Sequence, residues 1–264
     1  MQRMRLGAGP LTAAAAGLVK EAGPSAPVDP AAFLARLIDL RGSVELSHRL
    51  SDVARPRAPE PDLAAFSRLR ALVGERLGGV RADVDRTFSD PFQRRNKLPS
   101  AVEVHAALAQ AGALAGALAE RGSRPLPLNA AAEVLWVPFG ELVTRALERV
   151  RSEAASLREE IAPSLTALGP TAARLERLDA ALFGATVTGR RQIEDRLLPA
   201  LARSFAAHLR AAVVALPEPA APLHLAPWFA PGGWVRDEVG RGRAVVEAVF
   251  AHERRRIDAL VEPG

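Results

Sequence analysis

The sequence predicts an all-α fold organised around a long antiparallel helical hairpin that resembles a coiled coil. Apolar residues recur at steps of three and four through residues 141–216, which is the period of a helix face. Aromatic residues make up only 5% of the chain, and tyrosine and cysteine are absent. Alanine and leucine must therefore fill most of the core, a composition that suits closely packed helices better than a sheet.

The first arm of the hairpin is predicted by a heptad pattern. Its apolar residues are separated by steps of 4, 3, 4, 3 and 4, at Val143, Leu147, Val150, Ala154, Leu157 and Ile161. Pro163 removes a backbone donor and should bend the last turns. Because roughly three heptads are the lower limit for an independent coiled coil, the pattern favours an antiparallel partner within the chain. Pairing between two chains stays open.

The second arm follows Gly169-Pro170. It is predicted from a Leu and Val stripe at Leu175, Leu178, Leu182, Ile193, Leu197, Leu201, Phe205, Leu209, Val213 and Leu216. Gly184 and Gly189 should loosen the chain, and Pro199 predicts a kink or a new helix start. No polar residue interrupts this expected inner face.

Three consecutive regions are expected: an N-terminal helical region at 1–128, the hairpin at 129–216, and a strap with a C-terminal helix at 217–264. Caps and apolar spacing predict four helices in the first region, at Pro10–Val19, Asp29–Leu50, Asp62–Val80 and Ser100–Leu118. Ser100 and Glu103 form a capping-box pattern. Residues 216–231 are rich in proline and are expected to be nonhelical, with a last helix from Val235.

The composition also bounds the location of the protein. Arg3 and Arg5 before an apolar stretch resemble the start of a signal peptide, but Lys20 and Glu21 lie where a cleavage site should be, so a short helix is the expectation. No window reaches the run of about 18 apolar residues that a membrane span needs. We therefore expect a cytoplasmic protein without a membrane span.

No motif in the chain predicts catalysis, a cofactor or a metal ion. None of the five histidines has a second histidine three or four residues away, and neither a Gly-Lys-Ser/Thr nor a Gly-x-Ser-x-Gly element is present. Absence of cysteine excludes a thiol nucleophile. The sequence thus predicts a protein that is not an enzyme, although a site assembled from distant residues stays open.

Two clusters near the C-terminus are the candidate partner-binding residues. They are the aromatic Trp228, Phe229 and Trp234 and the basic Arg254, Arg255 and Arg256. The alternative for the aromatic residues is that they fix the strap across the hairpin. The alternative for the arginines is nucleic-acid binding, together with Arg94, Arg95, Lys97, Arg190 and Arg191. Acidic neighbours such as Glu253 and Asp258 favour a solvated helix face instead.

Four segments carry a resemblance to a known family: Ala31–Ser47, Leu175–Leu182, Arg190–Arg210 and Trp228–Val261. They resemble an uncharacterised proteobacterial family of helical proteins, whose genes lie near those for TolQ/MotA-like proton-channel and OmpA-like proteins. This resemblance implies a cytoplasmic accessory role beside an energised envelope complex, and it supplies no catalytic residues. The expected function is a noncatalytic scaffold or adaptor that binds a protein partner or a second copy of itself.

Overall fold

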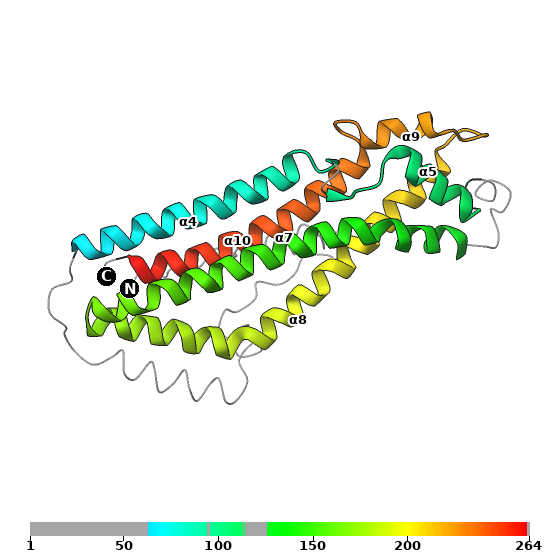
Figure 1. Ribbon diagram of the computed structural model, residues 1–264. Helices are drawn as coiled ribbons and strands as arrows, with labels where there is room; N and C mark the ends of the chain where they lie inside the picture. The colour runs from blue at the N-terminus through cyan, green and yellow to red at the C-terminus, as the bar shows by residue number, and fades with distance from the viewer. Residues whose placement is uncertain (1–62, 94–95, 113, 115–125, 263–264) are drawn as a thin grey trace, which may run out of the picture. The chain divides into compact units, whose positions relative to one another are not determined.

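The computed structural model describes residues 63–93, 96–112, 114 and 126–262, and its regular elements there are six α-helices with no strand (Figure 1). The helices are α4 (Leu63–Ser89), α5 (Ala101–Gln110), α7 (Leu126–Ala167), α8 (Pro170–Val214), α9 (Pro222–Phe229) and α10 (Trp234–Val261). The predicted all-α class is therefore confirmed. The helices expected before residue 62 lie outside the described residues.

The chain divides into two compact units. The described residues of the first unit are 63–82, 149–196 and 248–262, and the second unit comprises those within 83–148 and 197–247. Each of four helices has one part in the first unit and the other part in the second: α4, α7, α8 and α10. The division therefore cuts across the consecutive ranges 1–128, 129–216 and 217–264.

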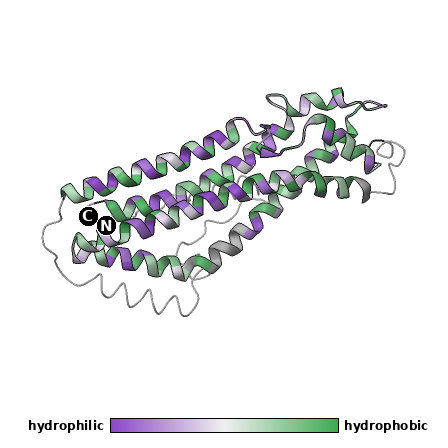
Figure 2. Ribbon diagram, viewed as in Figure 1, coloured by the Kyte–Doolittle hydropathy of each residue, from purple (hydrophilic) through white to green (hydrophobic). Residues whose placement is uncertain are grey.

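The heptad pattern of the first arm is found on the buried face of α7. Its six apolar residues are all buried, at Val143, Leu147, Val150, Ala154, Leu157 and Ile161. Figure 2 shows polar and apolar residues alternating along α7, as expected for a helix with one buried face. The helix begins at Leu126, well before the predicted start at Glu141. Coiled-coil pairing along its whole length stays a prediction.

Helix α8 differs from the expectation in two respects. It continues through Gly184, Gly189 and Pro199, so a new helix start at Pro199 is wrong, while the alternative of a kink there stays a prediction. Proline removes a single backbone donor, and the buried Leu197 and Leu201 on either side of Pro199 pack into the second unit and offset that loss. The leucines expected on its inner face near the start, Leu175, Leu178 and Leu182, are only partly buried.

Part of α8 has the length and composition of a membrane span. This segment, Asp195–Val214, is the single candidate among the described residues, and core helices of soluble proteins meet the same criteria. Leu201, Phe205 and Leu209 within it are almost fully buried in the second unit. The expected absence of a membrane span stays a prediction.

Helix α5 is shorter than predicted. It ends at Gln110 instead of continuing to Leu118, because Gly112 adopts the left-handed conformation, with φ of 67°, that commonly terminates a helix. The capping box at its start is confirmed: Ser100 N–H donates to Glu103 Oε2 at 2.7 Å, and Glu103 N–H donates to Ser100 Oγ at 3.3 Å. The Ser100 N–H and the Ser100 hydroxyl, which donates to Glu103 Oε2 at 2.8 Å, lower the pKa of the Glu103 carboxyl group.

The capping box supports a prediction for stability. Replacing Ser100 with alanine should lower the urea midpoint of unfolding slightly, because the first turn of α5 loses a side-chain acceptor. Circular dichroism measures the change. Ser89→Ala is the control, since the Ser89 hydroxyl makes only a long 3.4 Å hydrogen bond to the Arg86 carbonyl. Equal midpoints for the two variants would contradict the prediction.

The proline-rich strap contains a helix that the sequence did not predict. Pro222 and Pro227 lie inside α9, and the Ala221 N–H donates to His224 Nδ1 at 3.0 Å. Pro222 is tolerated at the first helical position, where its missing N–H has no helical partner, whereas Pro227 inside the helix removes one backbone donor. Within the second unit α9 packs on α5, where His105 Nε2 donates to the Ala220 carbonyl at 3.2 Å.

Candidate functional site

In the first unit, one carboxylate joins three helices. Asp179 of α8 accepts hydrogen bonds from Arg158 of α7 at Oδ2 and from Arg256 of α10, at 2.8 Å, at Oδ1. Both guanidinium groups also lie over the ring of Phe183, with Cζ atoms 5.0 Å and 4.7 Å from its centroid. Phe183 is one helical turn after Asp179, so the two side chains share a face of α8.

The three charged side chains of this Asp179 cluster are largely removed from water. Their exposed fractions are 14% for Asp179, 17% for Arg158 and 15% for Arg256. Burial lowers the pKa of the Arg158 guanidinium, whereas the charge of Asp179 acts in the opposite direction. Glu253 Oε2 lies 3.5 Å from Arg256 Nη1, too far for a strong hydrogen bond, and adds a second negative charge nearby. The Asp179 cluster holds α7, α8 and α10 together, and both Arg158 and Arg256 are bound to Asp179.

Beside this cluster, the first unit contains a groove of about 520 Å³. The volume falls within the range of about 300–1,000 Å³ that is usual for binding pockets. Twelve residues line it: Arg151, Ala155, Arg158, Glu159, Ala162 and Leu165 of α7, Glu176, Ala180, Phe183 and Val187 of α8, and Glu253 and Leu260 of α10. The lining combines seven apolar residues with five charged residues of both signs.

The spacing of the lining residues is that of a helix-packing surface. On α8 they are separated by steps of 4, 3 and 4, and the two residues of α10 are seven apart. On α7 a continuous series with steps of 4, 3, 4 and 3 runs from Arg151 to Leu165. These are the positions through which one helix contacts another. Alanines at three of them, Ala155, Ala162 and Ala180, leave room for larger side chains from an added helix.

The second unit contains a separate buried carboxylate, Glu238 of α10. Its side chain is 1% exposed, and Oε1 accepts from Arg241 on the same helix and from Ser204 Oγ at 3.0 Å. His208 Nδ1 lies 2.7 Å from Oε1 and 2.9 Å from the Ser204 carbonyl oxygen. Oε2 of Glu238 and the buried Nε1 of Trp234 have no hydrogen-bond partner among the described residues. The Ser204 hydroxyl donates to the Glu238 carboxylate and not to the His208 imidazole. These three residues therefore lack the serine-to-histidine hydrogen bond that activates a nucleophilic serine.

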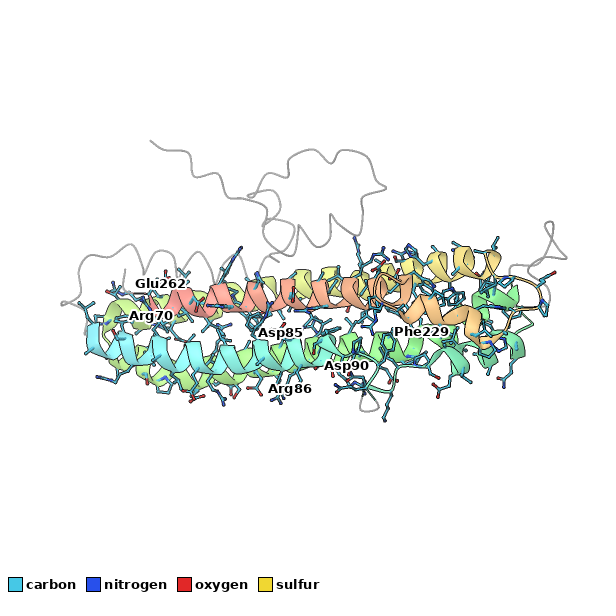
Figure 3. The ribbon with its side chains drawn as sticks, turned by 90° about the horizontal axis from the view of Figure 1, so that it is seen from above. Arg70, Asp85, Arg86, Asp90, Phe229 and Glu262 are labelled. Carbon is cyan, nitrogen blue, oxygen red and sulfur yellow. The ribbon has the colours of Figure 1, made fainter. Side chains whose placement is uncertain are left out.

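Aromatic side chains pack around this carboxylate. The ring of Phe205 lies 5.3 Å from that of Trp234 and 5.0 Å from that of Phe139, and Trp228 lies 5.5 Å from Trp234. Phe229 contacts Phe92 edge to face at 5.4 Å. Figure 3 labels Phe229 on α9 and Asp85 on α4. Asp85 accepts a hydrogen bond from Arg243 of α10 at 2.7 Å, a further link between helices of this unit.

The candidate partner-binding residues thus fall into two groups. Trp228 is buried, and Phe229 and Trp234 are partly buried, all three within the second unit. Trp234 packs against Phe205 of α8, Trp228 against Trp234 and Phe229 against Phe92, which agrees with the alternative that these residues fix the strap. In the first unit Arg256 is bound to Asp179, Arg254 pairs with Asp258 at 3.2 Å, and Arg255 is exposed. Their role in binding a partner stays a prediction.

The sequence does not predict the buried roles of Asp179 and Glu238. Glu238 lies beside Asp237 in the first turn of α10, but only Asp237 is exposed. One signal was available, because Glu238 lies three residues after Val235 and next to Val239, in the middle of an apolar stripe. Among the described residues, no group of three or more His, Asp or Glu side chains is placed to hold a metal ion.

Comparison with known proteins adds no relative: no protein-family model, curated protein or solved structure matches this chain. The predicted resemblance to a proteobacterial helical family stays a prediction.

Proposed function

We propose that this protein is a noncatalytic helical adaptor, and that it binds a helix of a protein partner in the groove of the first unit. The observation that carries the proposal is the groove of about 520 Å³ whose lining residues follow heptad steps on α7, α8 and α10. A fourth helix placed there would bury its apolar side chains against Phe183, Leu165 and Leu260. Cytoplasmic location and the absence of a membrane span are part of the same proposal.

The buried clusters support a binding role over a catalytic one. Asp179 is engaged by two guanidinium groups, and Glu238 accepts from Arg241 and Ser204 and lies beside the imidazole of His208. A general acid or base needs a site for the proton of a substrate within hydrogen-bond reach. Carboxylates enclosed by cations are suited instead to holding the helices that form the groove in fixed positions.

Filling the groove should abolish partner binding. Ala180 is exposed and lines the groove, so Ala180→Trp should occupy the space while leaving the buried core unchanged. The tagged full-length protein is returned to its source cell, and captured proteins are quantified by mass spectrometry. We expect a specific partner whose recovery falls at least about ten-fold with the variant, equivalent to about 1.4 kcal/mol of binding free energy.

Ala211→Trp is the matched control, because Ala211 is an exposed alanine on the same helix but belongs to the second unit. It should retain the partner. A partner captured equally by wild type and Ala180→Trp would contradict the proposal. Retention of nucleic acid that decreases steeply with salt, without any groove-dependent protein, would favour the alternative function of binding nucleic acid through arginine patches.

A further inference from the structure

We propose that the groove of the first unit selects a basic partner helix, one whose apolar stripe is bordered by lysine or arginine residues. This inference rests on the proposed function, since it names the chemistry of the partner helix at that same site. It depends on two glutamates of the groove lining, Glu159 of α7 and Glu176 of α8. Their surroundings differ from those of the other charged residues in the lining.

The other three charged residues of the lining already interact within the protein. Arg158 is bound to Asp179, and Glu253 Oε2 lies 3.5 Å from Arg256 Nη1. Arg151 also interacts with another residue. Because these charges are engaged, a partner that used them would have to compete with contacts that are already formed.

The two glutamates are available to a partner. Glu159 is exposed and Glu176 is partly exposed, and neither forms an ion pair or a side-chain hydrogen bond with another described residue. They come from two different helices of the groove, so a bound helix would meet carboxylates from both α7 and α8. A cation on that helix gains an attraction without first breaking an existing ion pair, which favours a partner of opposite charge.

Small residues beside the glutamates suit long basic side chains. Ala155 lies four residues before Glu159, and Ala180 lies four residues after Glu176, so each alanine shares a helix face with its glutamate. Both alanines are exposed. Lysine and arginine have long aliphatic stems that cover apolar surface while the charged end stays in contact with water or a carboxylate. Acidic side chains are shorter, and the two glutamates would repel them.

The charge of the whole chain predicts the opposite preference. The net charge is +5, so long-range attraction favours an acidic partner. A preference for a basic helix would therefore be a local property of the groove. The same two carboxylates disfavour the phosphates of a nucleic acid at this site, which separates the groove from the alternative function of binding nucleic acid.

Binding of two synthetic peptides to the full-length protein tests the inference. Each peptide is an amphipathic helix of about three heptads with a leucine stripe. The peptides differ only in the residues that border the stripe, which are lysines in one and glutamates in the other. Fluorescence anisotropy should show that the lysine peptide binds about ten-fold more tightly. Ala180→Trp should abolish its binding, because the peptide and the indole would occupy the same space.

Charge reversal in the groove should invert the preference between the peptides. The test variant carries Glu159→Lys with Glu176→Lys. The control carries Glu141→Lys with Glu148→Lys, which changes the net charge by the same amount at exposed positions of α7 in the second unit. We expect the control to keep the preference of the wild type. Circular dichroism establishes that both variants are folded.

Several results would overturn the inference: equal affinities, tighter binding of the glutamate peptide, binding of neither peptide, or the same preference in the test variant as in the wild type. A dimer that Ala180→Trp dissociates, measured by light scattering, would instead place a second copy in the groove. An oligonucleotide whose binding is lost with Ala180→Trp would place nucleic acid there. Either result would also overturn the inference.

The outcomes for the inference and for the proposed function are distinguishable. If Ala180→Trp loses a cellular partner while the two peptides bind equally, the adaptor function stands and the basic preference fails. If the lysine peptide is preferred through Glu159 and Glu176 but no captured protein depends on Ala180, the basic preference stands and the adaptor function fails.

Discussion

Replacing Asp179 with alanine should lower the free energy of unfolding by about 3–5 kcal/mol, the usual cost of removing one partner from a buried ion pair. The variant leaves the guanidinium groups of Arg158 and Arg256, each less than one-fifth exposed, without their common acceptor. Both remain beside Phe183 and repel each other at close range. The penalty therefore comes from two buried guanidinium groups left with Glu253 as their nearby negative charge, and not from the lost carboxylate itself.

Urea unfolding followed by circular dichroism measures the effect of Asp179→Ala. Urea is preferable to guanidinium because it does not screen charges. Asp258→Ala is the control: it breaks an ion pair whose partners, Arg254 and Asp258, are 58% and 40% exposed, so we expect a loss of at most about 1 kcal/mol. Similar losses for the two variants would show that the Asp179 cluster contributes no more than a surface pair.

The buried face of α7 could be predicted from the sequence because the evidence for it is local. Each of the six heptad residues from Val143 to Ile161 is apolar, and its spacing from the others is enough to assign it to the core. The Ser100 capping box is equally local, since it joins residues three positions apart. In both cases the residues that predict the feature and the residues that form it lie within the same short stretch of sequence.

The buried charges could not be predicted for the opposite reason. Periodicity assigns a charged residue to solvent, yet Asp179 lies inside the first unit because Arg256, 77 positions later, reaches it. Nothing in the sequence near either residue marks this pairing. The groove was likewise missed, because its alanines resemble ordinary helix-forming residues until three helices are placed around them. The site therefore depends on tertiary contacts, while the fold class depends on local ones.

Replacing Arg241 with alanine should also lower the free energy of unfolding, by about 2–3 kcal/mol, which is less than for a fully buried pair because the Arg241 side chain is 38% exposed. Glu238 is 1% exposed and cannot move into water without disrupting the core of the second unit. Its remaining donors are the Ser204 hydroxyl and the His208 imidazole, and neither replaces a permanent positive charge. Trp234 packs against the ring of His208, so tryptophan fluorescence reports unfolding at this cluster.

A second substitution tests the cause of this loss. Because the cost arises from an unpaired buried charge, adding Glu238→Gln to Arg241→Ala should restore most of the stability, although Glu238→Gln alone is itself destabilising. Such non-additivity is the signature of two residues that act through each other. Arg243→Ala is the control, since Arg243 pairs with partly exposed Asp85 and Glu247 and should cost at most about 1 kcal/mol. If the double variant is less stable than Arg241→Ala alone, Arg241 stabilises the unit by packing and not by neutralising Glu238.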